Sequence, residues 1–216
     1  MSISLVQKAE ARTTSSSTAA ATISASTGGN LLAVLINTSL SAGSDPATGI
    51  TDNAGNTYIK ADAVNLATLT SEIWYCPNCQ AGATTVTVTV TTSAVAINIV
   101  VVEFSGVKTT SPLEAHNTLG TTEAPVSPSL SASANSLQLA VIYPANIDIT
   151  SSQSPWTDIY DISNQGASTY YIAPSAGAYN ATFNPTTSQS FTAVGASFLQ
   201  ASITPPTVQT TMFLAI

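Results

Sequence analysis

The chain has 216 residues, of which 7% are charged and 44% hydrophobic, and its formal net charge is −7. Binding to a phosphate backbone requires clustered Lys and Arg, and only four such side chains are present, so no nucleic-acid partner is expected. The longest apolar stretch, 95–102, is interrupted by Asn98 and is far shorter than the ~18 residues of a membrane-spanning helix. A membrane partner is therefore not expected either.

Residues 2–9 alternate apolar and polar side chains, which predicts a strand of the folded domain. A secretory signal has a basic start followed by an unbroken apolar stretch, whereas this segment alternates and then becomes polar. We therefore expect synthesis in a reducing cytosol without a signal peptide. In that compartment two cysteines imply no disulfide framework.

Alternation with a period of two continues along most of the chain. Residues 84–91 alternate Thr and Val, as in an antiparallel strand with one face in the core and one in solvent. Residues 95–102 and 191–198 are apolar on both faces and are predicted to be central strands. Further strands are predicted at 20–24, 31–38, 58–63, 72–75, 137–143, 158–162, 169–172 and 179–183. Because no helical period competes, the predicted fold class is an all-β, antiparallel, jelly-roll-like β-sandwich.

Four short sequences occur twice in the chain, which predicts a sandwich built from two similar halves. The pairs are 30–36 with 136–142, 50–52 with 156–158, 71–77 with 168–174, and 100–105 with 194–199. The order of the segments is the same in both copies, and only the lengths between them differ. We therefore expect the same strand order in both halves.

The domain organisation follows from these repeats. We predict a single β-sandwich domain over 1–204, with pseudo-repeats at about 28–107 and 133–203. The prolines between the repeats indicate a linker at about 105–128, and the Pro-Pro pair after residue 204 closes the second repeat. Residues 205–216 are predicted to form a C-terminal arm.

The segment 52–56, Asp-Asn-Ala-Gly-Asn, is typical of a tight hairpin turn, because Asp and Asn cap backbone groups and Gly accepts a positive φ. A calcium loop is the alternative, since carboxylate and amide oxygens cluster here. The segment lacks the further ligands and terminal Glu of a helical calcium loop. A plain turn is therefore favoured, and no metal site is predicted.

Cys76 and Cys79 enclose Pro77 and Asn78 in a spacing found in redox and zinc sites. A redox site needs its first cysteine at the start of a helix, and a zinc site needs two further ligands. In order of preference, the interpretations are a β-turn with two incidental thiols, a turn disulfide between Cys76 and Cys79, and a metal site shared between subunits.

The residues for catalysis are few. His116 is the only histidine and lies in the predicted linker, so a Ser-His catalytic set and a multi-histidine metal site are both poorly supplied. The eleven acidic residues show no spacing that selects a glycosidase pair. We therefore predict that the protein is not an enzyme, that it has no catalytic or metal-binding residues, and that it needs no cofactor.

Aromatic side chains cluster in the repeated segments. Trp74, Tyr75 and Trp156 are candidates for an exposed surface that stacks on sugar rings or anchors a protein partner. Because alternation sends neighbouring side chains to opposite faces, core packing is the more common explanation for such residues. A glycan is accordingly an alternative partner.

The end of the chain is apolar. The residues concerned are Met212, Phe213, Leu214 and Ile216. An exposed apolar end would be adhesive, so this segment is expected to pack either as the last strand of its own sheets or as an arm on a neighbouring subunit. These four side chains are therefore candidates for intersubunit contact.

The succession of 29–34, 50–58, 73–75 and 102–107 resembles a β-sandwich module found in uncharacterised proteins of phages and bacteria. The resemblance covers about 28–107, and the motifs that carry it are turns and core strands. It implies a jelly-roll-like sandwich of the sort used for virion decoration, tail parts and surface attachment, and it brings no catalytic residues with it.

Together, the resemblance and the composition predict a structural virion accessory protein. The expected form is a phage capsid cement or decoration protein that stabilises the shell as a homo-oligomer, with a trimer favoured. Its partners would be capsid or other virion proteins, and its location the virion, after synthesis in the host cytoplasm. The alternatives are a carbohydrate-binding or adhesive surface module and a glycan-degrading tail enzyme.

Overall fold

The structure, a computed structural model, describes residues 1–40, 46–94, 96–145, 149, 151–162, 166–184 and 186–202. The regular secondary structure among these residues consists of β-strands alone, and the paired strands are antiparallel. The predicted all-β, sandwich-like class is therefore confirmed. The described part of the chain contains no helix long and apolar enough to cross a membrane.

The first half of the chain folds into two sheets that pack face to face. The five-stranded sheet has the order β1 (Ser4–Thr13), β8 (Ala96–Ser105), β3 (Leu31–Ser39), β6 (Leu69–Cys76) and β5 (Ile59–Leu66). The three-stranded sheet has the order β2 (Ser16–Thr22), β7 (Thr85–Ala94) and β4 (Ala47–Asp52). The alternating valines of β7, at 86, 88 and 90, are buried against Leu32 and Val34 of β3. The period of two in the sequence thus produces the face that closes this core.

The second half repeats this plan with a shorter outer layer. Its five-stranded sheet has the order β13 (Thr157–Ile162), β14 (Gly166–Ile172), β11 (Leu137–Pro144), β17 (Gln189–Phe198) and β9 (Leu113–Glu123). Two short ribbons cover it, β10 (Leu130–Ala132) with β15 (Gly177–Tyr179), and β12 (Ser151–Ser152) with β16 (Phe183–Asn184). Trp156, Phe183 and Phe191 fill the core between the ribbons and the sheet.

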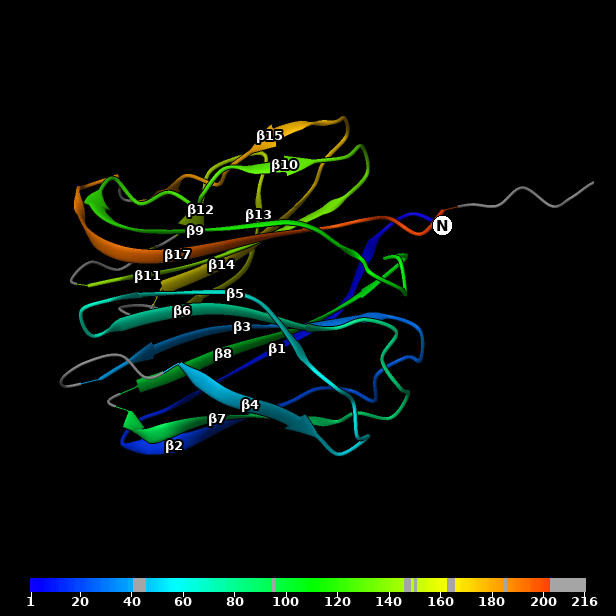
Figure 1. Cartoon of the computed structure of the whole chain (residues 1–216), viewed down its shortest axis with the longest axis horizontal. Helices are drawn as coiled ribbons and strands as arrows, with labels where there is room; N and C mark the ends of the chain where they lie inside the picture. Colours follow the sequence, from blue (N-terminus) through cyan, green and yellow to red (C-terminus); the bar gives the residue numbers. More distant parts are fainter. Residues whose placement is uncertain are drawn as a thin grey trace, which may run out of the picture.

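The two five-stranded sheets lie face to face in the middle of the molecule, so the layers stack as shown in Figure 1. The central core joins Leu35 and Phe104 of the first half to Leu139, Val194 and Phe198 of the second. Each half is therefore a sandwich of its own, packed back to back with the other. The predicted sandwich built from two similar halves thus consists of one sandwich in each half.

The two large sheets have equivalent strand orders. β1, β8, β3, β6 and β5 correspond in turn to β9, β17, β11, β14 and β13. The registers agree as well, since Phe104 pairs with Leu31 in one sheet and Phe198 pairs with Leu137 in the other. Three of the four repeated pairs in the sequence therefore lie on equivalent strands. The pairing of 50–52 with 156–158 is wrong, because 50–52 lies in β4 of the outer sheet and 157–158 in β13, which corresponds to β5. The apolar segments 96–102 and 191–198 lie in β8 and β17, which are flanked by strands on both sides, as predicted.

The segment predicted to be a linker, 105–128, contains β9 (Leu113–Glu123), the edge strand of the second sheet. Each repeat is therefore longer than predicted and begins with its own edge strand, β1 or β9. The physical reason is that an edge strand needs few apolar side chains, and β9 alternates only weakly between exposed and half-buried residues. His116 accordingly lies on a strand and not in a loop.

The described chain begins and ends at the same end of the molecule. The side-chain amide of Gln200 donates a hydrogen bond to the Met1 carbonyl over 2.8 Å, and Ser4 pairs with Ser105 at the start of β1. Figure 1 shows the N-terminus at this end. The predicted arm 205–216, with its four apolar side chains (Met212, Phe213, Leu214 and Ile216), lies outside the described residues.

Candidate functional site

Both lateral sides of the central interface carry a polar contact between the halves. On the β5–β9 side, His116 Nδ1 lies 2.7 Å from Asp62 Oδ2. On the β1–β13 side, Lys8 Nζ donates a hydrogen bond to the Ile159 carbonyl over 2.5 Å. These two contacts join residues that are far apart in the sequence, so each ties one half to the other.

The two contacts occupy equivalent positions in the repeats. Lys8 pairs with Val102, two residues before Phe104, and His116 pairs with Ala196, two residues before Phe198. Asp62 and Tyr160 are equivalent in the same way, because each follows a register shift, in β5 and in β13 respectively. At these matched positions the side chains differ: Lys8 and Tyr160 on one side correspond to His116 and Asp62 on the other.

The β5–β9 side is closed by packing. At Gly120 of β9, the position of an added Cβ lies only 3.3 Å from Val64 Cγ2, so the two edge strands are in close contact there. The contact between His116 and Asp62 joins the same two strands. Because both side chains are partly exposed, the pair contributes little to stability and mainly fixes the relative position of the strands.

The β1–β13 side is open and forms a pocket of about 260 Å³. Its lining residues are Lys8, Ala9, Glu10, Val100, Ile159 and Tyr160. Burial raises the pKa of Glu10, and the nearby charge of Lys8 only partly counters this effect. The pocket thus places an ammonium group, a carboxylate and an aromatic side chain around an apolar floor. Because one wall comes from each half, no contiguous motif in the sequence marked it.

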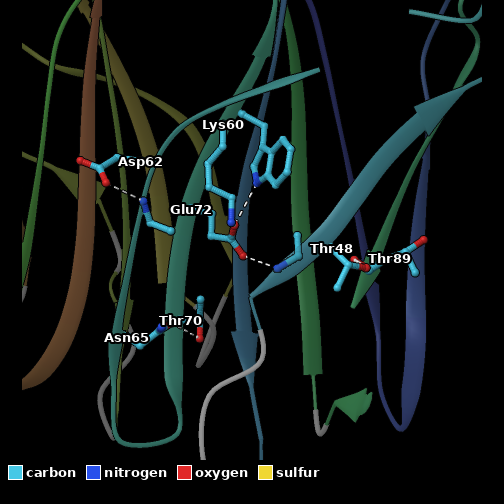
Figure 2. Close-up of polar contacts among 10 residues, drawn as sticks. Thr48, Lys60, Asp62, Asn65, Thr70, Glu72 and Thr89 are labelled. Carbon is cyan, nitrogen blue, oxygen red and sulfur yellow. Dashed lines mark hydrogen bonds and ion pairs between the residues drawn. The ribbon is translucent and has the colours of Figure 1, made fainter. Parts of the chain in front are cut away.

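A second polar cluster lies on the outer face of the first large sheet (Figure 2). The Glu72 side chain is fully buried, and its Oε2 lies 2.8 Å from Lys60 Nζ and accepts a hydrogen bond from Trp74 Nε1 over 2.9 Å. Its Oε1 accepts the backbone N–H of Ala47 over 2.5 Å. Glu72 therefore holds β4 to the sheet. Lys60 lies 4.8 Å from the centre of the Trp74 ring and covers it with a cation–π contact.

The aromatic residues predicted to form an exposed surface are mostly internal. Tyr75 is buried, and its ring meets Phe198 edge-on at 5.2 Å between centroids. Trp156 is also buried, and its Nε1 donates to the Asn180 carbonyl over 3.1 Å. This corrects the predicted interaction surface at Tyr75 and Trp156, because both side chains point into a hydrophobic core. Trp74 is half-buried beneath Lys60.

Cys76 and Cys79 are free thiols, so the turn disulfide is not formed in this structure. Both are buried in the outer core of the first half, and Cys79 Sγ donates to the Thr27 carbonyl over 3.3 Å. Burial, reinforced by neighbouring acidic groups, raises the pKa of each thiol to about 11. The reactive thiolate is therefore scarce at neutral pH, which favours the interpretation as incidental thiols in a turn.

Asp52 organises the turn at 52–56. Its carboxylate accepts hydrogen bonds from the backbone N–H groups of Ala54 and Asn56, from Asn56 Nδ2 over 2.7 Å, and from the Tyr58 hydroxyl over 2.8 Å. Burial alone would raise the pKa of Asp52, but these hydrogen bonds outweigh it and lower the pKa. With both oxygens bound to donors, the carboxylate supports a capped turn and not a calcium loop.

Two more carboxylates hold equivalent turns in the two halves. Glu103 Oε1 accepts the backbone N–H of Thr27 over 2.9 Å, in the turn that leads into β3. Glu114 Oε1 accepts the backbone N–H of Ser133 over 3.0 Å, in the turn that leads into β11. The acids come from different strands, β8 and β9, so the repeated sequences did not reveal this shared role. The signal that could have revealed it is the pair of polar turns that precede β3 and β11.

The Glu114 carboxyl is expected to make the fold less stable in acid. Burial alone would raise its pKa, but hydrogen bonds from Ser133 and Ser197 outweigh burial and lower it from 4.5. Such a carboxyl stabilises the fold above its unfolded pKa and loses that effect as the pH falls through the folded value. Urea unfolding of the wild type and Glu114→Gln, from neutral pH into strong acid, tests this. The variant should be less stable at neutral pH and lose less stability below pH 4.5, and equal losses would contradict the assignment.

No group of three or more His, Cys, Asp or Glu side chains that could hold a metal ion occurs among the residues that the structure describes. The comparisons with protein-family models, curated proteins and solved structures give no match to this chain. The resemblance to a phage and bacterial module therefore stays a prediction, and the functional argument depends on the geometry of the molecule.

Proposed function

We propose that the protein is a structural virion accessory protein of the cement or decoration type, which acts as a homo-oligomer by burying surface against capsid proteins. The observation that carries the proposal is the role of the internal carboxylates. Glu72, Glu103 and Glu114 each accept backbone N–H groups that join one strand or turn to another. Groups that could serve in catalysis thus hold the scaffold, which suits a protein whose task is mechanical.

The exposed apolar side chains support a contact at one end. Among the described residues, the large hydrophobic side chains that are exposed are Met1 at 71%, Val6 at 47% and Ile59 at 46%. Val6 follows Leu5, which pairs with Phe104, and Ile59 begins β5. All three lie towards the end where Met1 meets Gln200. Apolar residues within a polar surface favour protein contacts.

Removing part of the predicted arm, or placing charge at this end of the described chain, is expected to abolish assembly without unfolding the protein. The test variants are the deletion of 208–216 and the double substitution Val6→Lys with Ile59→Lys, which places charge where apolar surface would be buried. Sedimentation velocity reports the oligomer, co-sedimentation with purified shells reports binding, and circular dichroism reports the fold. Ala20→Lys, on the exposed face of β2, is the matched control and should assemble normally. A wild-type chain that stays monomeric and does not bind shells would contradict the proposal.

A further inference from the structure

The two sides of the central interface differ where the repeats should match. At equivalent positions, the β5–β9 side has His116 and Asp62, whose side chains bind each other. The β1–β13 side has Lys8 and Tyr160, and Lys8 bonds to a backbone carbonyl instead. The first arrangement closes its side, and the second leaves the 260 Å³ pocket open. The pocket thus arises from particular side chains, since the backbone plan is the same on both sides.

The polar groups of this pocket retain capacity for hydrogen bonds. Lys8 Nζ has three N–H donors, of which one is directed to Ile159. Glu10 receives no hydrogen bond from the described residues and is partly removed from water, which is why its pKa is raised. Lys8 and Glu10 are two residues apart on β1 and therefore project from the same face of the strand. The pocket thus offers donors and acceptors side by side.

We propose that the pocket between β1 and β13 binds a single neutral sugar ring, a pyranose. Each sugar hydroxyl both donates and accepts, so neighbouring hydroxyls suit the Lys8 ammonium and the Glu10 carboxylate together. The apolar side chains of Val100 and Ile159, with Tyr160, suit the C–H face of the ring. The volume is below the usual range for drug-sized ligands, which fits one small ring.

The charge balance favours a sugar over a charged ligand. Lys8 and Glu10 carry opposite charges and interact with each other, so the pocket has no net charge to attract an anion or a cation. A free amino acid could pair with both groups, but its charges would have to displace the attraction already present between Lys8 and Glu10. A neutral ligand keeps that attraction and adds hydrogen bonds to it.

The test is a titration of the full chain with methyl glucoside, methyl mannoside, methyl galactoside and N-acetylglucosamine. Two-dimensional amide NMR spectra monitor the binding. At least one of these probes should shift the amides of Lys8, Glu10 and Tyr160 saturably. Glu10→Ala and Lys8→Met should each weaken that binding roughly tenfold, since each removes a hydrogen bond to a charged group. Both positions are exposed, so the variants should fold.

The matched control is Thr118→Ala. Thr118 pairs with Val194 as Glu10 pairs with Val100, so it holds the equivalent position on the closed side, and its loss should leave sugar binding unchanged. Three results would overturn the proposal: no saturable shift with any sugar, equal weakening by Thr118→Ala, or stronger binding of glycine than of every sugar. Shifts of the same amides on dilution without sugar would instead assign the two edges to a second copy of the chain.

Discussion

Gly106→Ala is expected to lower the free energy of unfolding by roughly 3 kcal/mol, from a left-handed backbone and a steric overlap together. Gly106 has a φ of 75°, and a Cβ at this position would lie 2.2 Å from the Ser2 carbonyl oxygen and 3.0 Å from the Ile3 nitrogen. The obstacle is backbone, which cannot rotate away as a flexible side chain can. The chain must therefore shift where the N-terminal segment meets the end of β8.

Gly82→Ala is the matched control for this change. Gly82 also has a positive φ, of 92°, but an added Cβ would meet no atom within 4 Å. Its cost should be the conformational part alone, about 1–2 kcal/mol. Urea unfolding compares the two variants, and limited proteolysis reports whether the segment before β1 has detached. Equal costs for the two alanines would show that the Ser2 carbonyl does not pack against Gly106.

Much of the fold could be predicted because an alternating pattern stays the same when two segments are misaligned by two residues. The repeated sequences aligned Tyr75 with Ile172, whereas strand pairing equates Tyr75 with Tyr170, since their partners Ala33 and Leu139 are equivalent. A shift of two residues keeps every side chain on the same face of the sheet. The alternation of faces along the strand was therefore preserved even though the alignment of this repeat was shifted.

The stacking of the two halves was harder to predict. A strand that is apolar on both faces, such as β3 or β8, shows that something covers each face, but not which sheet does so. The valines of β7 cover one face of the first large sheet, and Leu139 and Phe198 of the other half cover the opposite face. Because all these side chains are hydrophobic, composition does not distinguish the partners.

The candidate pocket could not be predicted for a related reason. Its two walls, around Lys8 and Ile159, are 151 residues apart in the sequence and meet only because the sheets stack with β1 beside β13. Glu10 lies on an edge strand whose alternation is explained by solvent exposure alone. The aromatic residues attracted attention because they are rare, yet Tyr75 and Trp156 are buried for packing. Local patterns report burial well and report contacts between distant strands poorly.

Glu103→Ala is expected to have the largest effect of any single substitution considered, roughly 3–5 kcal/mol of lost stability from the lost hydrogen bonds and the cavity together. Glu103 is fully buried, and its carboxylate accepts the Thr27 backbone N–H over 2.9 Å, Asn30 Nδ2 over 2.6 Å and Gln7 Nε2 over 2.5 Å. Alanine would leave the Thr27 N–H and Asn30 Nδ2 without this acceptor, and it would open a cavity beside β3. Gln7 Nε2 would keep the Ser24 carbonyl as its acceptor. The cost of unpaired buried donors exceeds the net value of the bonds themselves.

Glu103→Gln separates the charge from the shape. Its carbonyl oxygen can still accept from Thr27 and Asn30, while its amide group would face Gln7 Nε2 and lose that one hydrogen bond, because Ser24 holds the Gln7 amide in its present orientation. The loss should therefore be smaller, about 1–2 kcal/mol. Urea unfolding measures both variants, and hydrogen exchange at the Thr27 amide should speed up strongly in the alanine variant and slightly in the glutamine variant. If the alanine variant proved as stable as the wild type, Glu103 would be free for another task, and the proposal that these acids serve the scaffold would fail at one of its two fully buried members.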